Sequence, residues 1–417
     1  MKLSKYNVEK KEKDGSYLIY NTITSAILEL DCNYANSYFK IEDDKECDKS
    51  DLKMALIEGG MLIEDERDEY EELVIKNRIE RFSDSTLTLT IAPTLACNFC
   101  CPYCYEHGRE YISMTEKVQN QLVEQIRQKY QHIQELTVSW YGGEPLLALK
   151  TIKELTKKLN EVLPNRCKYN ADMVTNGYNL TREVAEQLKN LNITYVQVTL
   201  DGSRKAHDSR RILHNGNPTF EHILKNLREC TDILNISIRI NVDKGNINEA
   251  LEIFDWLDKY ELKGKVGYYL APVDDINGIC NSHICMEKPQ YAKEEMLFYR
   301  YGIKKGFMYQ GVKPSNYGIC GAISLNSFVI APDGELYKCW NDIGYKERSI
   351  GNLEDGMKLT NKFVKWLSCT IEKSKECKEC KFFPVCYGGC AASKEKICVP
   401  LKWNSDEMLE LMKEESK

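Results

Sequence analysis

The sequence CNFCCPYC, residues 97–104, places four cysteines within eight residues at the end of an apolar, strand-like run. Three of them, Cys97, Cys101 and Cys104, have the spacing CxxxCxxC on a segment that we expect to be a loop. Thiolates at that spacing converge on one soft metal centre, and three ligands leave one iron of a [4Fe-4S] cluster without a protein ligand. The alternative is a structural zinc loop that takes its fourth ligand from a residue such as Cys100.

The overall composition favours metal binding over disulfide bonding. The chain has 417 residues, of which 42% are hydrophobic and 29% charged, and its net charge of -6 offers no basic surface to nucleic acid. The first residues lack the apolar core of a signal peptide, and no apolar run reaches the roughly eighteen residues that span a bilayer. We therefore expect a cytoplasmic protein with no nucleic-acid or membrane partner. In that reducing compartment the 18 cysteines are expected to bind metal or to do redox chemistry.

From the run just before this loop onward, β-rich runs alternate with amphipathic helical patterns. The strand-like runs are residues 87–92, 136–141, 169–175, 195–200, 236–242 and 266–271. The helical patterns are residues 115–129, 151–163, 181–191, 220–234 and 248–257, the first preceded by a capping-box pattern from Ser113 to Glu116. Repeated strand-helix alternation predicts an α/β fold with a parallel sheet, doubly wound or curled into a full or partial barrel.

Sites in such folds lie at the carboxyl ends of the strands. At those ends the sequence places CNFCCPYC, Gly142-Gly143-Glu144-Pro145, Thr175-Asn176-Gly177 and Asp201-Gly202.

The chain divides into three parts. The alternating part covers residues 86–306. Before it, residues 1–82 predict a small α+β domain with a strand over 17–22, helices over 25–30 and 51–58, and a charged linking helix over 65–82. After it, residues 307–417 are rich in glycine and cysteine and end in a predicted helix over 405–413.

The C-terminal part holds a second set of cysteines. Their spacing is Cys320, then Gly334-x4-Cys339, then Cys377-x2-Cys380-x5-Cys386-x3-Cys390, and finally Cys398. Seven cysteines in this arrangement indicate metal binding, and a pair of ribbon-type structural zinc sites is the alternative interpretation.

The first cysteine loop, the aromatic residue before its last cysteine and the Gly-Gly-Glu-Pro strand end together resemble the radical S-adenosylmethionine (SAM) superfamily over residues 86–275. The resemblance implies a partial (β/α)6 barrel in which Cys97, Cys101 and Cys104 hold a [4Fe-4S] cluster. The open iron of that cluster would bind SAM, and reduction would release a 5′-deoxyadenosyl radical that takes a hydrogen atom from a substrate.

The same resemblance assigns SAM contacts to residues near the strand ends. They are Tyr103, Gly142, Gly143, Glu144, Thr199 in Thr-Leu-Asp-Gly, Arg211 in the His-Asp-x-x-Arg stretch from His207, and Leu270 against the adenine. Each has a structural alternative, because Gly142 and Gly143 fit an ordinary turn and the strand residues fit a core. The fifth strand carries Arg239-Ile240-Asn241 in place of the family pattern Gly-x-Ile-x-Gly-x-x-Glu, so contacts from that strand are not assigned.

The C-terminal pattern resembles the SPASM domain, which holds two auxiliary [4Fe-4S] clusters, so the chain would carry three such clusters. The resemblance assigns Cys377, Cys380, Cys386 and Cys398 to the distal cluster and Cys320, Cys339 and Cys390 to the nearer one. Sulfatase-maturing relatives have a further cysteine where this chain has Asn326. Where this chain has Trp340, they have an aspartate that serves as the catalytic base. Both departures favour thioether-forming peptide maturases, in which a substrate thiolate occupies the open auxiliary iron. Completion of that cluster by Cys369, or by Cys280 and Cys285, is the alternative.

Residues 1–82 resemble, in length and strand-helix order, the winged-helix-like domain with which peptide maturases bind the leader of a precursor, and a structural cap is the alternative. The predicted function is therefore a radical SAM peptide maturase that forms thioether links from cysteine sulfur to carbon in a cysteine-containing precursor peptide. A flavodoxin or ferredoxin would supply electrons. The other possibilities are a related maturase that makes a carbon-carbon link or oxidises cysteine or serine, and a non-catalytic metal-binding module.

Overall fold

The computed structural model describes residues 1–42, 47, 49–106, 108–274, 282–308, 319–370, 375–393 and 397–415. One cysteine considered above as a cluster ligand, Cys280, lies outside the described residues. Among the described residues, no helix is long and apolar enough to cross a bilayer.

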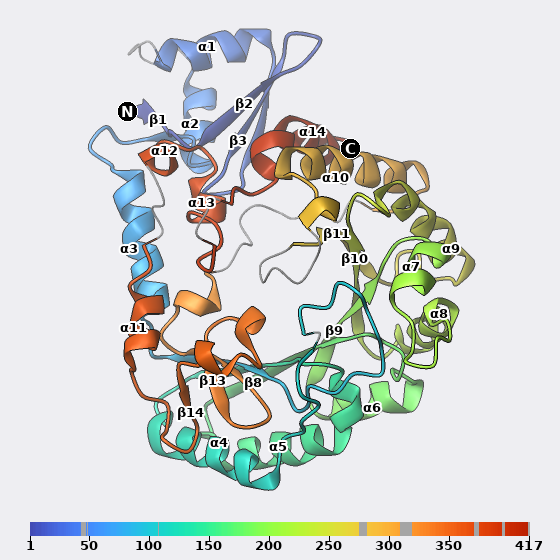
Figure 1. Ribbon diagram of the computed structural model, residues 1–417. Helices are drawn as coiled ribbons and strands as arrows, with labels where there is room; N and C mark the ends of the chain where they lie inside the picture. The colour runs from blue at the N-terminus through green and yellow to red at the C-terminus, as the bar shows by residue number, and fades with distance from the viewer. Residues whose placement is uncertain are drawn as a thin grey trace.

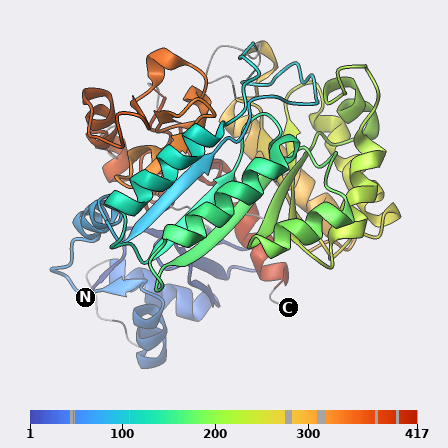
Figure 2. The same ribbon diagram turned by 90° about the horizontal axis from the view of Figure 1, so that it is seen from below.

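Six parallel strands, which lie side by side in sequence order, form most of a curved sheet, and the last of the six lies at one of its edges (Figure 1). They are β6 (Thr86–Ile91), β7 (Glu135–Trp140), β8 (Lys168–Thr175), β9 (Ile193–Leu200), β10 (Asn235–Val242) and β11 (Gly267–Pro272). Helices lie on the outer side of the arc: α4 (Glu116–Lys129), α5 (Leu149–Val162), α6 (Arg182–Asn190), α7 (Arg204–Arg210), α8 (Phe220–Cys230) and α9 (Ile253–Lys259) (Figure 1). Figure 2 shows α4 and α5 lying across this outer face. The predicted partial barrel of six strands is confirmed.

The two faces of the sheet differ in chemistry because side chains alternate along each strand. One alternating set, which includes Leu89, Val138 and Ile240, is fully buried in the main core under the helices. The other set faces the inner side of the arc, is polar and remains partly exposed. It includes Thr90, Ser139, Asp172, Gln197, Arg239 and Tyr269. We call this inner side the lumen. Closed barrels of this type fill the interior with branched apolar side chains, whereas this polar lumen can receive a ligand.

The start of α4 differs from the prediction. Thr115 is its N-cap, and the Thr115 hydroxyl accepts a hydrogen bond from the backbone N–H of Val118 at 3.4 Å. The capping box predicted at Ser113 is wrong, because Ser113 pairs with Thr94 in an isolated β-bridge and its hydroxyl bonds that of Thr94 at 2.9 Å. An extended residue in such a bridge cannot begin a helix, so the helix starts two residues later.

The N-terminal domain contains a three-stranded antiparallel sheet and two helices. Its elements are β1 (Lys2–Leu3), β2 (Asn7–Lys11), β3 (Tyr17–Asn21), β4 (Ile27–Leu30), α1 (Cys32–Glu42), α2 (Ser50–Glu58) and β5 (Leu62–Ile63). The helix predicted over residues 25–30 is wrong. Ser25 adopts a left-handed φ of 61°, which turns the chain back so that Leu30 pairs with Tyr17 of β3.

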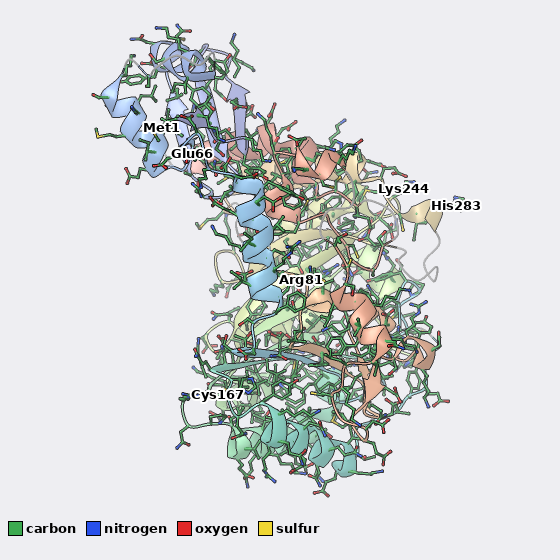
Figure 3. The ribbon with its side chains drawn as sticks, turned by 90° about the vertical axis from the view of Figure 1, so that its left-hand side faces the viewer. Met1, Glu66, Arg81, Cys167, Lys244 and His283 are labelled. Atoms are coloured by element: carbon green, nitrogen blue, oxygen red, sulfur yellow. The ribbon has the colours of Figure 1, made fainter. Side chains whose placement is uncertain are left out.

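Helix α3 (Glu69–Arg81) connects this domain to the barrel, and Figure 3 shows it running between the labelled residues Glu66 and Arg81. Asp68 caps its start by accepting hydrogen bonds from the backbone N–H groups of Tyr70 and Glu71. At its other end, the Arg81 guanidinium donates to the carbonyls of Ile323 and Leu367 in the C-terminal part.

The C-terminal part extends the barrel sheet instead of forming a separate one. Strand β12 (Ser327–Ile330) pairs in parallel with β6, followed by β13 (Glu335–Tyr337) and β14 (Gly351–Asn352). Its helices are α11 (Asn361–Leu367), α12 (Lys375–Lys378), α13 (Phe383–Cys386) and α14 (Leu401–Glu415), the last packed on α10 (Lys288–Lys304). One apolar cluster joins Tyr6 of the N-terminal domain, Tyr70 of α3 and Phe383, so the N-terminal domain and α3 pack against the C-terminal part.

Candidate functional site

The cysteine loop begins just after β6 and brings three thiols together. Burial, followed by the charge of Glu144 and then those of Cys101 and Cys104, raises the pKa of Cys97 to about 12, and burial raises that of Cys104 to about 11. The backbone N–H of Phe99 donates to the Cys97 sulfur at 3.4 Å. Cys100 has an exposed side chain, while its backbone N–H donates to Ile212.

The Gly142-Gly143 turn packs directly against the backbone that leads into this loop. A Cβ atom on Gly143 would lie 2.4 Å from the carbonyl oxygen of Ala96, and one on Gly142 would lie 2.5 Å from that of Thr94. Backbone N–H groups of Gly143 and Glu144 donate to Thr94 and Ala96 at 3.1 and 2.9 Å. The glycines therefore set the spacing between the turn and the cysteine loop.

The Glu144 side chain holds the turn to the end of β8. Its fully buried carboxylate accepts hydrogen bonds from the Thr175 hydroxyl at 2.6 Å, the backbone N–H of Asn176 at 2.8 Å and that of Leu146 at 3.0 Å. Asn176 in turn donates to the side chain of Asn98 at 2.7 Å. Because these contacts occupy the carboxylate, the geometry favours a SAM contact through the backbone of the turn.

Tyr103 points toward the end of β9, into a buried network of charges. Its hydroxyl lies 2.8 and 2.7 Å from the two carboxylate oxygens of Asp201 and accepts a hydrogen bond from Nη1 of Arg211 at 2.9 Å. Arg210 bonds Asp201 and Asp243 at 3.1 and 2.8 Å, and its guanidinium carbon lies 4.5 Å from the centre of the Tyr103 ring. This network fixes the orientation of both arginines beside the cysteine loop.

Two other residues of the His-Asp-x-x-Arg stretch hold Arg211 in place. The backbone N–H of Asp201 donates to Nδ1 of His207, so Nε2 carries the proton and bonds the Thr219 hydroxyl at 3.0 Å. That hydroxyl then donates to the Arg211 carbonyl. Burial lowers the pKa of His207, which is therefore neutral. Asp208 accepts from the backbone N–H of Thr219 at 2.9 Å.

A cavity of about 500 Å³ lies beside Tyr103, between the cysteine loop and α7. Its lining includes Pro102, Arg210, Asp243 and Asn246. Of the expected SAM contacts only Tyr103 lines it, so this cavity lies next to the predicted site without coinciding with it.

The two strand residues predicted to contact SAM lie on opposite faces of the sheet. Thr199 lies on β9 in register with Arg239 of β10, and alternation places it on the lumen side. Leu270 is 3% exposed and belongs to the main core, on the face opposite to its neighbour Tyr269. The geometry therefore gives no support to the predicted contact of Leu270 with adenine.

Two sets of C-terminal cysteines include members that influence one another's pKa. Burial and the nearby thiols of Cys380, Cys377 and Cys398 raise the pKa of Cys386 to about 11. In the other group, burial and the thiols of Cys320 and Cys390 raise the pKa of Cys339 to about 12.

Two further residues, Cys369 and Lys338, lie close to the nearer group. Cys369 also lies close enough to raise the pKa of Cys320, after burial and the thiol of Cys390. Lys338 is buried next to Cys339, and its ammonium donates to the carbonyls of Ser324 and Ser327. Lys338 therefore fixes the segment between Cys320 and β12.

These groups suit iron-sulfur clusters. Each contains three or four thiols held near one another, and burial alone opposes ionisation of the thiols in each group. A bound cationic metal centre reverses that preference, because it stabilises the thiolate directly. Among the described residues, no three Cys, His, Asp or Glu side chains converge on a single metal ion.

An aromatic pair links the turn to the nearer cysteine group, and no sequence pattern predicted it. Tyr141, directly before Gly142, stacks on Trp340, directly after Cys339, with ring centres 6.1 Å apart and planes at 16°. Trp340 is 53% exposed. The pair therefore forms part of the wall between the two candidate cofactor sites.

Comparison with known proteins agrees with this geometry. A family model for the radical SAM superfamily matches residues 91–257, which contain the cysteine loop and four of the six barrel strands in full. The chain is 23% identical to the radical SAM cyclopropyl synthase TigE of Paramaledivibacter caminithermalis, over 94% of this chain and 90% of that protein. It is 28% identical to a cysteine-type anaerobic sulfatase-maturating enzyme of Clostridium perfringens, over 76% and 93% of the two chains.

Two solved structures share the fold. The structure of native anSMEcpe with bound AdoMet and Cp18Cys peptide matches with a TM-score of 0.62 and 20% identity, over 79% of this chain and 96% of that one. Streptococcus suis SuiB bound to precursor peptide SuiA matches with a TM-score of 0.56 and 16% identity, over 96% and 97%. With its cysteine loop at the end of the first barrel strand and inside the segment that matches the superfamily model, the chain is a radical SAM enzyme related to these maturases.

Proposed function

We propose that this enzyme is a peptide maturase that joins a cysteine sulfur of a precursor peptide to a carbon atom of the same peptide. The observation that carries the proposal is the nearer cysteine group: Cys320, Cys339 and Cys390 lie together, while Asn326 and Trp340 stand where sulfatase maturases have a cysteine and an aspartate. The relatives named above, a cyclopropyl synthase and a sulfatase-maturating enzyme, support the coarser assignment to peptide or protein modification.

In this proposal the cysteine groups hold three [4Fe-4S] clusters. Cys97, Cys101 and Cys104 hold the first, and the two C-terminal groups hold the auxiliary clusters. When bound, the first cluster and SAM supply a 5′-deoxyadenosyl radical that removes a hydrogen atom from the peptide. A flavodoxin or ferredoxin supplies the electron for SAM cleavage.

The chain's own residues position SAM and exclude water. The Gly142-Gly143 turn is held beside the cysteine loop by two backbone hydrogen bonds. The N–H of Gly143 donates to Thr94 at 3.1 Å and that of Glu144 donates to Ala96 at 2.9 Å. Arg211, fixed by Tyr103 and the neutral His207, supplies a positive charge for the SAM carboxylate. Thr199 faces the same space from β9.

The N-terminal domain supports recognition of a leader segment. Strands β2 and β4 are the edges of its sheet, and each has a side chain paired with the C-terminal part: Lys10 of β2 with Glu410 at 2.9 Å and Glu29 of β4 with Lys413 at 2.6 Å. On β4, Ile27 is 37% exposed. A leader that adds a strand to β4 would gain affinity through backbone hydrogen bonds.

Substitution at that edge tests the leader contact. Ile27→Lys places a charge on the exposed edge and is expected to weaken peptide binding at least tenfold, while SAM cleavage without peptide stays unchanged. Met54→Lys, on the 65% exposed Met54 of α2, is the matched control. Equal peptide affinity in both variants would remove the leader-binding role.

The thioether itself is tested by mass spectrometry with alkylation of free thiols. The reconstituted enzyme, SAM and dithionite are incubated with cysteine-rich peptides encoded by short reading frames beside the gene. A thioether lowers the peptide mass by two hydrogens and removes one alkylatable thiol. Loss of two hydrogens with every thiol still alkylatable indicates a carbon-carbon link, a cyclopropane or oxidation of serine. Loss of two hydrogens together with exchange of one sulfur for oxygen indicates oxidation of cysteine to an aldehyde. Either of these last results refutes the thioether proposal and favours the alternative maturase.

A further inference from the structure

Arg239 is a cation on the lumen face of β10 that its neighbours hold in one orientation. Its Nε donates to Oδ1 of Asn241 at 2.8 Å and its Nη1 to the Tyr269 hydroxyl at 3.5 Å. The guanidinium carbon lies 5.9 Å from the centre of the Tyr269 ring, and the Tyr269 hydroxyl donates to Gln197 at 2.6 Å. These contacts come from β9, β10 and β11, three adjacent strands of the sheet (Figure 1).

No carboxylate of the described residues pairs with Arg239 within 4.0 Å, in contrast to the other arginines near the site. Arg210 pairs with Asp201 and Asp243. The lumen carboxyl of Asp172 instead accepts a hydrogen bond from Ser139 at 3.0 Å, and burial raises its pKa. A guanidinium has five N–H donors, so Arg239 retains donors that have no acceptor among the residues that the structure describes.

The surroundings of Arg239 connect the two candidate cofactor sites. The pKa of Tyr141 is raised to about 12, chiefly by burial, and the charge of Arg239 opposes that rise, so the two side chains lie near each other. Tyr141 directly precedes Gly142 and stacks on Trp340 beside Cys339. Arg239 therefore faces the part of the lumen between the SAM turn and the nearer cysteine group.

We propose that Arg239 binds the carboxylate of an aspartate or glutamate side chain of the peptide substrate, next to the residue that loses its hydrogen. This inference rests on the proposed function and specifies its substrate class: a precursor with an acidic residue at or beside the modified position. A planar guanidinium held by Asn241 and Tyr269 is preorganised for two parallel hydrogen bonds to a carboxylate. The Tyr141–Trp340 pair gives the flanking peptide an aromatic surface.

The carboxylate of SAM is the other candidate ligand for the Arg239 guanidinium. The position of Arg211 favours the peptide, because Arg211 lies at the cysteine loop, with its Nη1 2.9 Å from the Tyr103 hydroxyl. Arg239 makes its described polar contacts only with β10 and β11. One positive charge is thus available on each side of the lumen, one for SAM and one for the substrate.

The test compares two synthetic tripeptides, acetyl-Gly-Asp-Gly amide and acetyl-Gly-Asn-Gly amide. Calorimetry measures their binding to the reconstituted holoenzyme with SAM present and no reductant, so that no turnover occurs. In the unsubstituted enzyme we expect the aspartyl peptide to bind about tenfold more tightly. Arg239→Gln should reduce that ratio to about one, and Arg239→Lys should retain part of it. Arg228→Gln, on the outer face of α8 where Arg228 pairs with Glu261, is the matched control.

Three results would overturn the inference. They are equal binding of the two tripeptides to the unsubstituted enzyme, no detectable binding of either, and a ratio that survives Arg239→Gln. SAM binding is measured on the same samples, and a tenfold loss of SAM affinity in Arg239→Gln would assign the guanidinium to the SAM carboxylate instead. The product analysis described above judges the proposed function independently, because the tripeptide test uses no product.

Discussion

Replacing Gly143 by alanine should separate the SAM turn from the cysteine loop. The new Cβ would lie 2.4 Å from the Ala96 carbonyl oxygen and 2.6 Å from that of Leu95, whereas ordinary contact begins at 3.4 Å. Backbone atoms must therefore move by 3.4 - 2.4 = 1.0 Å. Gly143 has no positive φ, so the substitution tests displacement alone and adds no backbone strain.

A displacement of this size at a reacting geometry costs about 100-fold in rate, or about 2.7 kcal/mol of activation free energy. We expect the rate of 5′-deoxyadenosine formation under dithionite, followed by chromatography, to fall by about that factor in Gly143→Ala. The auxiliary cysteine groups lie elsewhere, so the variant should retain at least the iron of the two auxiliary clusters.

Gly59→Ala is the matched control. Gly59 has a φ of -74°, its nearest contact with an added Cβ is 3.3 Å, and it lies in the N-terminal domain. The control should cleave SAM at the unsubstituted rate. If Gly143→Ala also cleaves SAM within a factor of about two of that rate, the turn does not set the geometry of the cluster and SAM, and the reasoning fails.

Three further predictions concern the cysteines and one buried acid. Cys97→Ala, Cys101→Ala or Cys104→Ala should abolish 5′-deoxyadenosine formation and lower the iron content from about twelve to about eight per chain; retained cleavage would contradict the assignment of the loop. Cys369→Ala should leave the iron content and the electron paramagnetic resonance spectrum of the auxiliary clusters unchanged, whereas a changed spectrum would make Cys369 a ligand and close the open iron. Burial raises the pKa of Glu295 from 4.5 to about 7, so its contribution to stability is present below pH 4.5 and is lost as the pH rises through 7. The free energy of unfolding should therefore fall by up to ~3 kcal/mol across that window in anaerobic urea titrations, and Glu295→Gln should flatten the dependence; an equal pH dependence in both proteins would refute it.

Local periodicity was sufficient to predict a parallel sheet with alternating helices, whereas the partial barrel followed from the resemblance to the radical SAM superfamily. Strand residues such as those of β7 and β10 alternate buried apolar and exposed polar side chains, and the helices between them repeat apolar residues every three to four positions. The same local reading failed at Ser25 and Ser113. At Ser25 a left-handed residue in a hairpin turn replaced the predicted helix, and at Ser113 the outcome depended on a β-bridge to Thr94, 19 residues away.

The sequence by itself also determined the cysteine spacing and hence the candidate cluster ligands, because thiol chemistry and spacing are written in the chain. Only the tertiary structure decided how the remaining residues divide their roles. It directed the Glu144 carboxylate to Thr175, buried Leu270 under α10, and brought Tyr141 against Trp340 across about 200 residues. Such contacts follow from the curvature of the sheet and the packing of the C-terminal part on it. The physical reason is that residue spacing encodes interactions within an element, whereas pairing between distant elements depends on which faces are buried together.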